Sequence, residues 1–139
     1  MKKAMIALLF VGTVFIATGC AGSNQSETTA QSTEVVEEGT YANVTVDEAQ
    51  KLIEEGITII DVRTPGEYAE GHIPNSLLIP LQEIDTRINE FSADEQYLIV
   101  CRSGNRSAQA SEILVQNGLE DIYNMLGGMN EWTGEVVTE

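Results

Sequence analysis

Positive charge is scarce in this chain. Only 7 Lys and Arg residues stand against 22 Asp and Glu residues among 139, which gives a formal net charge of −15. Nucleic acids and anionic membrane surfaces attract basic proteins, so this balance argues against both as partners that bind through surface charge. We therefore expect no nucleic-acid partner and good solubility.

Soft metal ligands are equally scarce. The chain has two cysteines, Cys20 and Cys101, and one histidine, His72. A structural zinc site usually needs four Cys or His ligands, and these residues supply too few. We predict no metal site and no cofactor.

The N-terminal segment lacks acidic residues. A basic start at residues 1–3 is followed by an uncharged apolar run over residues 4–17 and then by Thr18, Gly19 and Cys20. This order is typical of a secretory signal peptide, and the apolar run is too short for a comfortable membrane span. We predict a signal peptide over residues 1–19.

The end of this segment, Ala17-Thr18-Gly19-Cys20, resembles the lipobox of bacterial lipoproteins, with Ala17 where that family usually has Leu. The resemblance implies a lipid on Cys20, which becomes the first residue after cleavage, and an extracytoplasmic protein that is anchored to a bacterial membrane by that lipid. Two alternatives stay open. The segment is an uncleaved anchor, or it is cut elsewhere and releases a soluble protein.

The residues that follow Cys20 lack aromatic side chains. Residues 21–40 are rich in Ser, Thr, Gln, Asn and Glu, and such a segment cannot bury enough apolar surface to fold. We predict that residues 20–40 are a lipidated cysteine and a disordered polar tether. If Cys20 carries lipid, Cys101 has no disulfide partner, and a lone thiol outside the cytoplasm favours chemistry over structure.

From residue 41 onward, short apolar runs alternate with amphipathic segments. The apolar runs predict strands at residues 41–44, 57–60, 77–79, 97–100 and 121–123. The amphipathic segments predict helices at residues 45–55, 67–71, 81–91, 108–116 and 127–132. This alternation indicates an α/β fold that has a parallel sheet with helices on both faces.

In open parallel sheets, ligands bind at the carboxyl ends of the strands. Cys101 follows the apolar run 97–100, and the Gly-containing loop after it leads into a predicted helix. Loop N–H groups and a helix N-terminus favour an anion, and nearby Arg102 and Arg106 favour the thiolate. Asp61 and Arg63 leave the second predicted strand on the same side of the sheet, possible neighbours of this site.

The alternative for Cys101 is a small buried apolar residue, which is common for a cysteine after a strand. Two arginines and a glycine within the next five residues argue against a purely structural role. We therefore predict that Cys101 is a nucleophile. The predicted anion-binding residues are those of the loop: Arg102, Ser103, Gly104, Asn105 and Arg106.

Three motifs in order resemble those of rhodanese domains. Residues 60–74 (IDVRTPGEYAEGHIP) look like the first signature, residues 101–107 (CRSGNRS) like the active loop, and residues 127–132 (GGMNEW) like the C-terminal motif. The resemblance implies a rhodanese-like single domain over residues 41–139. It also implies a thiosulfate sulfurtransferase-like enzyme, in which Cys101 takes sulfur from thiosulfate, a persulfide or a polysulfide and passes it to a thiol or another thiophilic acceptor.

Other functions remain open. Rhodanese-like folds also serve as sulfur-carrier or partner-binding modules without turnover. A phosphatase or arsenate reductase is disfavoured, because tyrosine-phosphatase-type loops have one residue more between Cys and Arg than the four between Cys101 and Arg106. A peroxide sensor would need a resolving cysteine. We expect a monomer.

Four residues of the first motif have structural interpretations. We expect His72 to be buried and hydrogen-bonded rather than catalytic. Asp61 and Arg63 are expected to pair with each other or to bind loop backbone, and Glu67 to cap the adjacent short helix.

Overall fold

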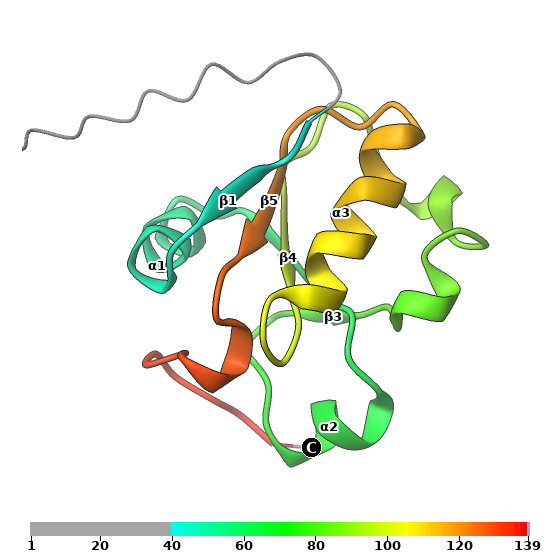
Figure 1. Ribbon diagram of the computed structural model, residues 1–139. Coiled ribbons are helices and arrows are strands. Elements are labelled where there is room, and N and C mark those ends of the chain that lie inside the picture. Colours follow the sequence, from blue (N-terminus) through cyan, green and yellow to red (C-terminus); the bar gives the residue numbers. More distant parts are fainter. Residues whose placement is uncertain (1–39, 139) are drawn as a thin grey trace, which may run out of the picture. The chain divides into compact units, whose positions relative to one another are not determined.

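A parallel sheet organises residues 40–138, which are the part of the chain that the computed structural model describes (Figure 1). These residues belong to one compact unit. The predicted signal peptide, Cys20 and nearly all of the predicted tether lie outside the described residues. Within residues 40–138, no helix is both long enough and apolar enough to cross a membrane.

The sheet of the described residues has five strands in the order β1-β5-β4-β2-β3, and each pair of neighbours is parallel. The strands are β1 (Ala42–Val44), β2 (Thr58–Asp61), β3 (Leu77–Leu78), β4 (Tyr97–Val100) and β5 (Ile122–Met125). All four residues of β4 are buried. A continuous buried run of this kind is what a central strand with both faces covered requires.

Helices cover both faces of the sheet. The α-helices are α1 (Val46–Glu54), α2 (Pro65–Glu70) and α3 (Asn105–Gln116), and the short 3-10 helices are η1 (Leu81–Glu83), η2 (Ile88–Glu90) and η3 (Gly128–Asn130). In Figure 1, α1 and α3 lie on opposite sides of the sheet. The predicted α/β fold is therefore confirmed.

Two apolar cores form because side chains alternate along β4. Leu98 and Val100 pack with Ala49 of α1, whereas Ile99 packs with Leu114 of α3. Leu98 and Ile99 have no exposed surface. Each residue of this one strand therefore stabilises the layer on its own side, and the strand is held from both faces.

The first helix begins as the sequence predicts. The Thr45 hydroxyl accepts a hydrogen bond from the Glu48 N–H, and the Glu48 carboxylate accepts one from the Thr45 N–H. This capping box satisfies two N–H groups that a helix start leaves without partners. Gly56, which has φ of 95°, then turns the chain into β2.

The predicted helix over residues 81–91 is wrong, because η1 and η2 are separate 3-10 turns joined by residues 84–87. The Thr86 hydroxyl donates to the Glu83 carbonyl at 2.9 Å, and such a side-chain bond competes with α-helical pairing. The apolar spacing still identified the buried side correctly. Ile84 lies in the core, and three neighbours of the same pattern pack against it: Leu81, Ile88 and Phe91.

The helix after the cysteine begins at Asn105, not at Ala108 as predicted. Gly104 adopts φ of 91° immediately before it, a conformation that glycine reaches without strain. The loop is therefore shorter than expected, and Arg106 and Ser107 already lie in the first turn of α3. The other predicted elements exist with ends that differ by at most two residues.

We predict that truncation on either face of β4 is costly. Leu98→Ala and Ile99→Ala should each lower the free energy of unfolding by about 2–5 kcal/mol, since each leaves a cavity in a close-packed core. Leu77→Ala is the control, because Leu77 is 55% exposed on the edge strand β3. It should cost less than about 1 kcal/mol in urea unfolding. An equal loss for Leu77→Ala would contradict this account of the core.

Candidate functional site

Cys101 follows β4 directly, at the carboxyl end of the central strand. Its backbone is held by the sheet on one side, and α3 begins four residues later. The residue has no exposed surface. The fold thus places a single thiol under a tight turn that leads into the start of a helix.

A backbone N–H and a hydroxyl lie within hydrogen-bond distance of the sulfur. The Gly104 N–H donates to Cys101 Sγ at 3.1 Å, and the Ser107 hydroxyl lies 3.3 Å from Sγ. Ser107 is fully buried, so its hydroxyl has lost contact with water. It contacts the sulfur from the first turn of α3, one helical turn beyond the bend at Gly104.

Ser107 was not among the predicted site residues. It belongs to the CRSGNRS motif, but the predicted helix start at residue 108 left it in the loop. A helix that begins at Asn105 turns the residue at its third position back over the bend. Recognition of Gly104 as the residue before the helix is the signal that would have identified Ser107.

Burial and hydrogen bonding act in opposite directions on the pKa of Cys101. Burial is the largest effect and raises the pKa, because it removes water from the thiolate. The Ser107 hydroxyl and the N–H groups of Ser107, Ser103 and Gly104 oppose it. Together these hydrogen bonds prevail, and the pKa of Cys101 is lowered from that of an ordinary thiol.

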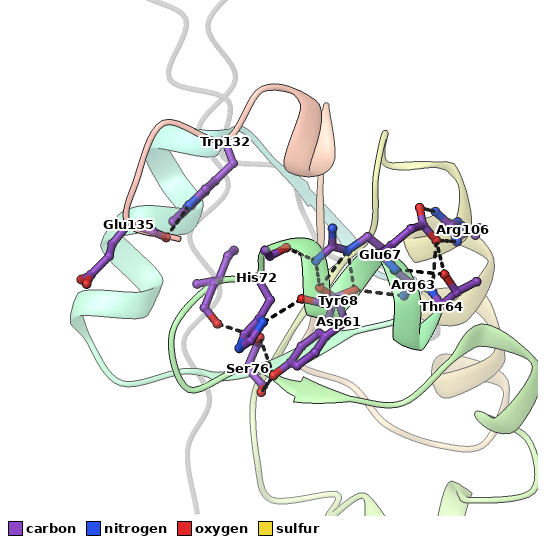
Figure 2. Close-up of polar contacts among 12 residues, drawn as sticks. Asp61, Arg63, Thr64, Glu67, Tyr68, His72, Ser76, Arg106, Trp132 and Glu135 are labelled. Atoms are coloured by element: carbon purple, nitrogen blue, oxygen red, sulfur yellow. Dashed lines mark hydrogen bonds and ion pairs between the residues drawn. The ribbon is translucent and has the colours of Figure 1, made fainter. Parts of the chain in front are cut away.

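The guanidinium of Arg106 is engaged by a carboxylate rather than by the sulfur (Figure 2). Arg106 donates to the two oxygens of Glu67 at 2.8 Å and 2.7 Å, an ion pair with two parallel hydrogen bonds. Glu67 also accepts hydrogen bonds from the Thr64 N–H and hydroxyl, as the predicted cap of α2. The carboxylate therefore joins α2 to the start of α3.

This ion pair shifts the pKa values of both of its partners. The hydrogen bond from Arg106 lowers the pKa of Glu67 to about 2, against the opposing effect of burial. Glu67 raises the pKa of Arg106, and a smaller electrostatic attraction to Cys101 acts in the same direction. The charge of Arg106 is thus largely balanced by Glu67.

The remaining loop side chains face solvent. Arg102, Ser103 and Asn105 are exposed, and Gly104 is buried. Arg102 lines a surface pocket of about 430 Å³ that Glu70, Met129 and other residues also line. Among residues 40–138, Arg102 is the one arginine without an ion-pair partner.

Asp61 and Arg63 form a buried ion pair (Figure 2). Arg63 Nη2 lies 2.6 Å from Asp61 Oδ2 and donates a second hydrogen bond, of 2.8 Å, to the Gly71 carbonyl. A buried charge is stable only when it is paired in this way. The structure supports their expected structural role and shows no contact of theirs with Cys101 in the described residues.

His72 is buried and hydrogen-bonded, as predicted. Its ring stacks on Tyr68 with centroids 3.6 Å apart, and Nδ1 lies 2.9 Å from the Tyr68 carbonyl oxygen. Both rings are buried, and the Tyr68 hydroxyl donates to the Ser76 carbonyl at 2.6 Å. These contacts, which Figure 2 shows, close the loop between α2 and β3.

No metal centre is formed by the described residues. Nowhere in residues 40–138 do three or more His, Cys, Asp or Glu side chains gather closely enough to hold an ion.

Comparison with known proteins gives consistent matches. The family model described as the rhodanese-like domain matches residues 45–135. A sulfurtransferase of Allochromatium vinosum is 40% identical over 85 residues, which are 60% of this chain and 79% of that protein. The thiosulfate sulfurtransferase GlpE of Pseudomonas syringae is 34% identical over 92 residues, which are 66% of this chain and 87% of that protein.

Coverage differs among the relatives. YrkF of Bacillus subtilis, which is provisionally named a sulfur carrier protein, is 38% identical over 82 residues, but the match spans 59% of this chain and only 44% of that protein. Among solved structures, a rhodanese-like domain protein from Staphylococcus aureus has 40% identity and a TM-score of 0.65, covering 70% of this chain and 98% of that one.

We predict that the Glu67 carboxylate stabilises the fold in a pH-dependent way. Its pKa is about 2 in the folded state and near 4.5 otherwise, so its contribution is complete above pH 4.5 and is lost as the pH falls toward 2. Glu67→Gln, which keeps a capping side chain, should lower the free energy of unfolding by about 1–2 kcal/mol at pH 7.

The measurement is urea unfolding at pH 7 and at pH 3, with Glu112→Gln on the exposed side of α3 as the control. The difference between the parent chain and Glu67→Gln should shrink at pH 3. A difference that is independent of pH would show that the charge of Glu67 is not what stabilises the pair.

Proposed function

The chain belongs to the rhodanese-like domain family, and on this premise we propose that it is a sulfurtransferase that carries sulfur on Cys101. The donor is a sulfane compound such as thiosulfate, a persulfide or a polysulfide. The acceptor is a thiol or another thiophile. Likeness to a sulfurtransferase and to a thiosulfate sulfurtransferase supports this proposal.

One observation carries the proposal: Sγ sits inside hydrogen-bond donors at the end of the central strand. The Gly104 N–H and the Ser107 hydroxyl lie 3.1 Å and 3.3 Å from Sγ. Such donors stabilise a thiolate nucleophile, as an oxyanion hole stabilises an oxygen anion. The same groups favour a persulfide anion, because its charge also resides on sulfur.

The proposed reaction has two balanced steps. First, the Cys101 thiolate attacks the outer sulfur of thiosulfate, a Sγ–S bond forms, the S–S bond breaks, and sulfite leaves with the electron pair. Second, an acceptor thiolate attacks the terminal sulfur, and the Sγ–S bond breaks to return the Cys101 thiolate. Neither step needs an external oxidant, a reductant or a metal ion.

The loop residues divide the remaining work. Arg102 is an exposed loop residue without an ion-pair partner in the described residues. We therefore assign to it the role of attracting an anionic donor. Ser103 and Gly104 contribute N–H groups, and Asn105 begins α3. Arg106 acts through Glu67 on the position of the loop rather than on the donor.

A second candidate function is sulfur carriage without turnover on small donors. The likeness to YrkF, which is provisionally named a sulfur carrier, favours it. A carrier would form the same persulfide on Cys101 but would release its sulfur only to a partner protein. The difference lies in the acceptor and not in the first step.

Phosphatase and arsenate reductase activities fit the site less well. A phosphatase loop uses its arginine to hold the tetrahedral oxyanion, but Arg106 has both terminal nitrogens on Glu67. The four intervening residues also form a smaller ring than a phosphatase loop. We therefore assign sulfur, not phosphate, as the group that is transferred.

Location and assembly belong to the proposal as well. We propose that the protein is extracytoplasmic, that a lipid on Cys20 anchors it to a bacterial membrane, and that the chain acts as a monomer. The signal-like order of residues 1–20 supports the anchor. The acidic composition argues against attachment through surface charge.

We predict that Cys101 gains one sulfur atom. The full chain with Cys20→Ser, in which Cys101 is the single thiol, should increase in mass by one sulfur when it is mixed with thiosulfate or polysulfide. The further change Cys101→Ala should abolish this adduct, as intact-protein mass spectrometry can measure. Absence of the adduct with every sulfane donor would refute sulfur loading, and an adduct that no small thiol discharges would favour the carrier.

We also predict that the Ser107 hydroxyl sustains the thiolate. Ser107→Ala should raise the pKa of Cys101 and slow its alkylation at neutral pH by roughly tenfold, because one hydrogen bond to the thiolate is lost. Ser111→Ala is the matched control, since Ser111 is equally buried and donates to the Ser107 carbonyl instead. The pH profile of alkylation by iodoacetamide measures both. Equal effects of the two variants would assign the change to packing alone.

A further inference from the structure

The turn that follows β5 is hydrogen-bonded to the active loop that begins at Cys101. Within η3, the Met129 N–H donates to the Cys101 carbonyl at 2.8 Å, and the Asn130 N–H donates to the Arg102 carbonyl at 2.9 Å. These bonds connect residues almost thirty positions apart in the sequence. The two peptide groups that leave Cys101 are therefore held by the C-terminal motif.

The position of a carbonyl group determines where its amide hydrogen points. In a planar trans peptide the C=O and the N–H point in opposite directions, and the described residues contain no cis peptide bond. A carbonyl of Arg102 that is held toward Asn130 thus directs the Ser103 N–H away from η3. That N–H is one of the groups that stabilise the Cys101 thiolate.

Gly128 allows this close approach. Its φ is 56°, and a Cβ atom at this position would lie 2.7 Å from both the Arg102 carbonyl carbon and the Ser103 nitrogen, and still closer to the Cys101 carbonyl oxygen. Real Cβ atoms essentially never come so near to backbone. Any side chain at residue 128 must therefore displace the loop or the turn.

The preceding glycine provides a contrast within the same turn. Gly127 has φ of 73°, but a Cβ atom there would meet the side chain of Glu131, which is exposed and can move aside. Gly118, with φ of 88°, has nothing within 4 Å of such an atom. The three glycines share the backbone conformation, and only Gly128 touches the active loop in this way.

We propose that residues 128–130 are a positioning element for the active loop. The N–H groups of Met129 and Asn130 hold the Cys101 and Arg102 carbonyls away from the sulfur, and this aims the Ser103 N–H at Sγ. Gly128 is the residue whose lack of a side chain permits the contact. The effect of this element on sulfur transfer rests on the proposed function, but its effect on the pKa of Cys101 does not.

The test compares three glycine variants in the full chain with Cys20→Ser. Gly128→Ala should raise the pKa of Cys101 and lower its alkylation rate at neutral pH by about tenfold. Gly127→Ala and Gly118→Ala introduce the same backbone strain, but the added Cβ atom does not reach the loop. These two variants should therefore leave the pKa of Cys101 unchanged and its alkylation rate within about twofold of the parent, even where stability falls. Circular dichroism and urea unfolding show which variants are folded.

A folded Gly128→Ala with the parent pH profile would overturn the proposal, and so would an equal shift for Gly127→Ala. If Gly128→Ala does not fold, an amide-to-ester replacement at Asn130 decides. Ligation at Cys101 can introduce it, and it removes the N–H without adding atoms. A raised pKa of Cys101 supports the proposal, and an unchanged one refutes it.

Failure of the positioning element can be told apart from failure of the proposed function. The pKa of Cys101 is measured by alkylation and needs no sulfur donor. Sulfur loading is measured separately by mass. A chain that fails to load sulfur but loses its low pKa on Gly128→Ala would retain the positioning role and lose the sulfurtransferase assignment.

Discussion

Burial of a thiolate removes the water that would stabilise it, and the site depends on the donors that replace this water. Burial is the largest single effect on the pKa of Cys101, and it acts against ionisation. The Ser107 hydroxyl and three backbone N–H groups reverse its sign. Their geometry must therefore be held closely, because a small displacement of the loop would weaken these hydrogen bonds and raise the pKa of Cys101.

The surrounding fold restrains this loop from three directions. The central strand β4 fixes Cys101, since its side chains are packed in both cores. The first turn of α3 carries Ser107, and Glu67 fixes that turn through Arg106. The turn at η3 holds the loop carbonyls from behind. Elements that are distant in the sequence thus meet around the loop of residues 101–104.

Much of this arrangement follows from local sequence patterns. Apolar runs identified the strands, and the motif CRSGNRS located the loop that surrounds Cys101. The apolar spacing of residues 81–91 predicted burial correctly but not a helix, because spacing reports which side is buried, while local hydrogen bonds such as that of Thr86 decide the backbone. Ser107 was missed because Gly104 adopts the left-handed backbone conformation. As a result α3 begins three residues earlier in the sequence than predicted.

Contacts between distant segments were not predictable in the same way. Glu67 was expected to cap α2, and it does, but its pairing with Arg106 joins residues that are 39 positions apart. The bonds from η3 to the loop are made by backbone groups, which no side-chain pattern encodes. Gly128 stands in a recognisable motif, yet only the close approach of two turns explains why no larger residue fits there.

The arrangement separates ionisation of the sulfur from attraction of a donor. The described hydrogen bonds to Sγ come from neutral groups, and Arg106, which is attracted to Cys101, is balanced by Glu67. Buried neutral donors are little affected by salt, whereas an exposed cation is screened. Arg102 is exposed and without an ion-pair partner in residues 40–138, and it is the residue to which we assign the attraction of an anionic donor. Salt should therefore weaken the approach of an anionic donor while it changes the pKa of Cys101 little.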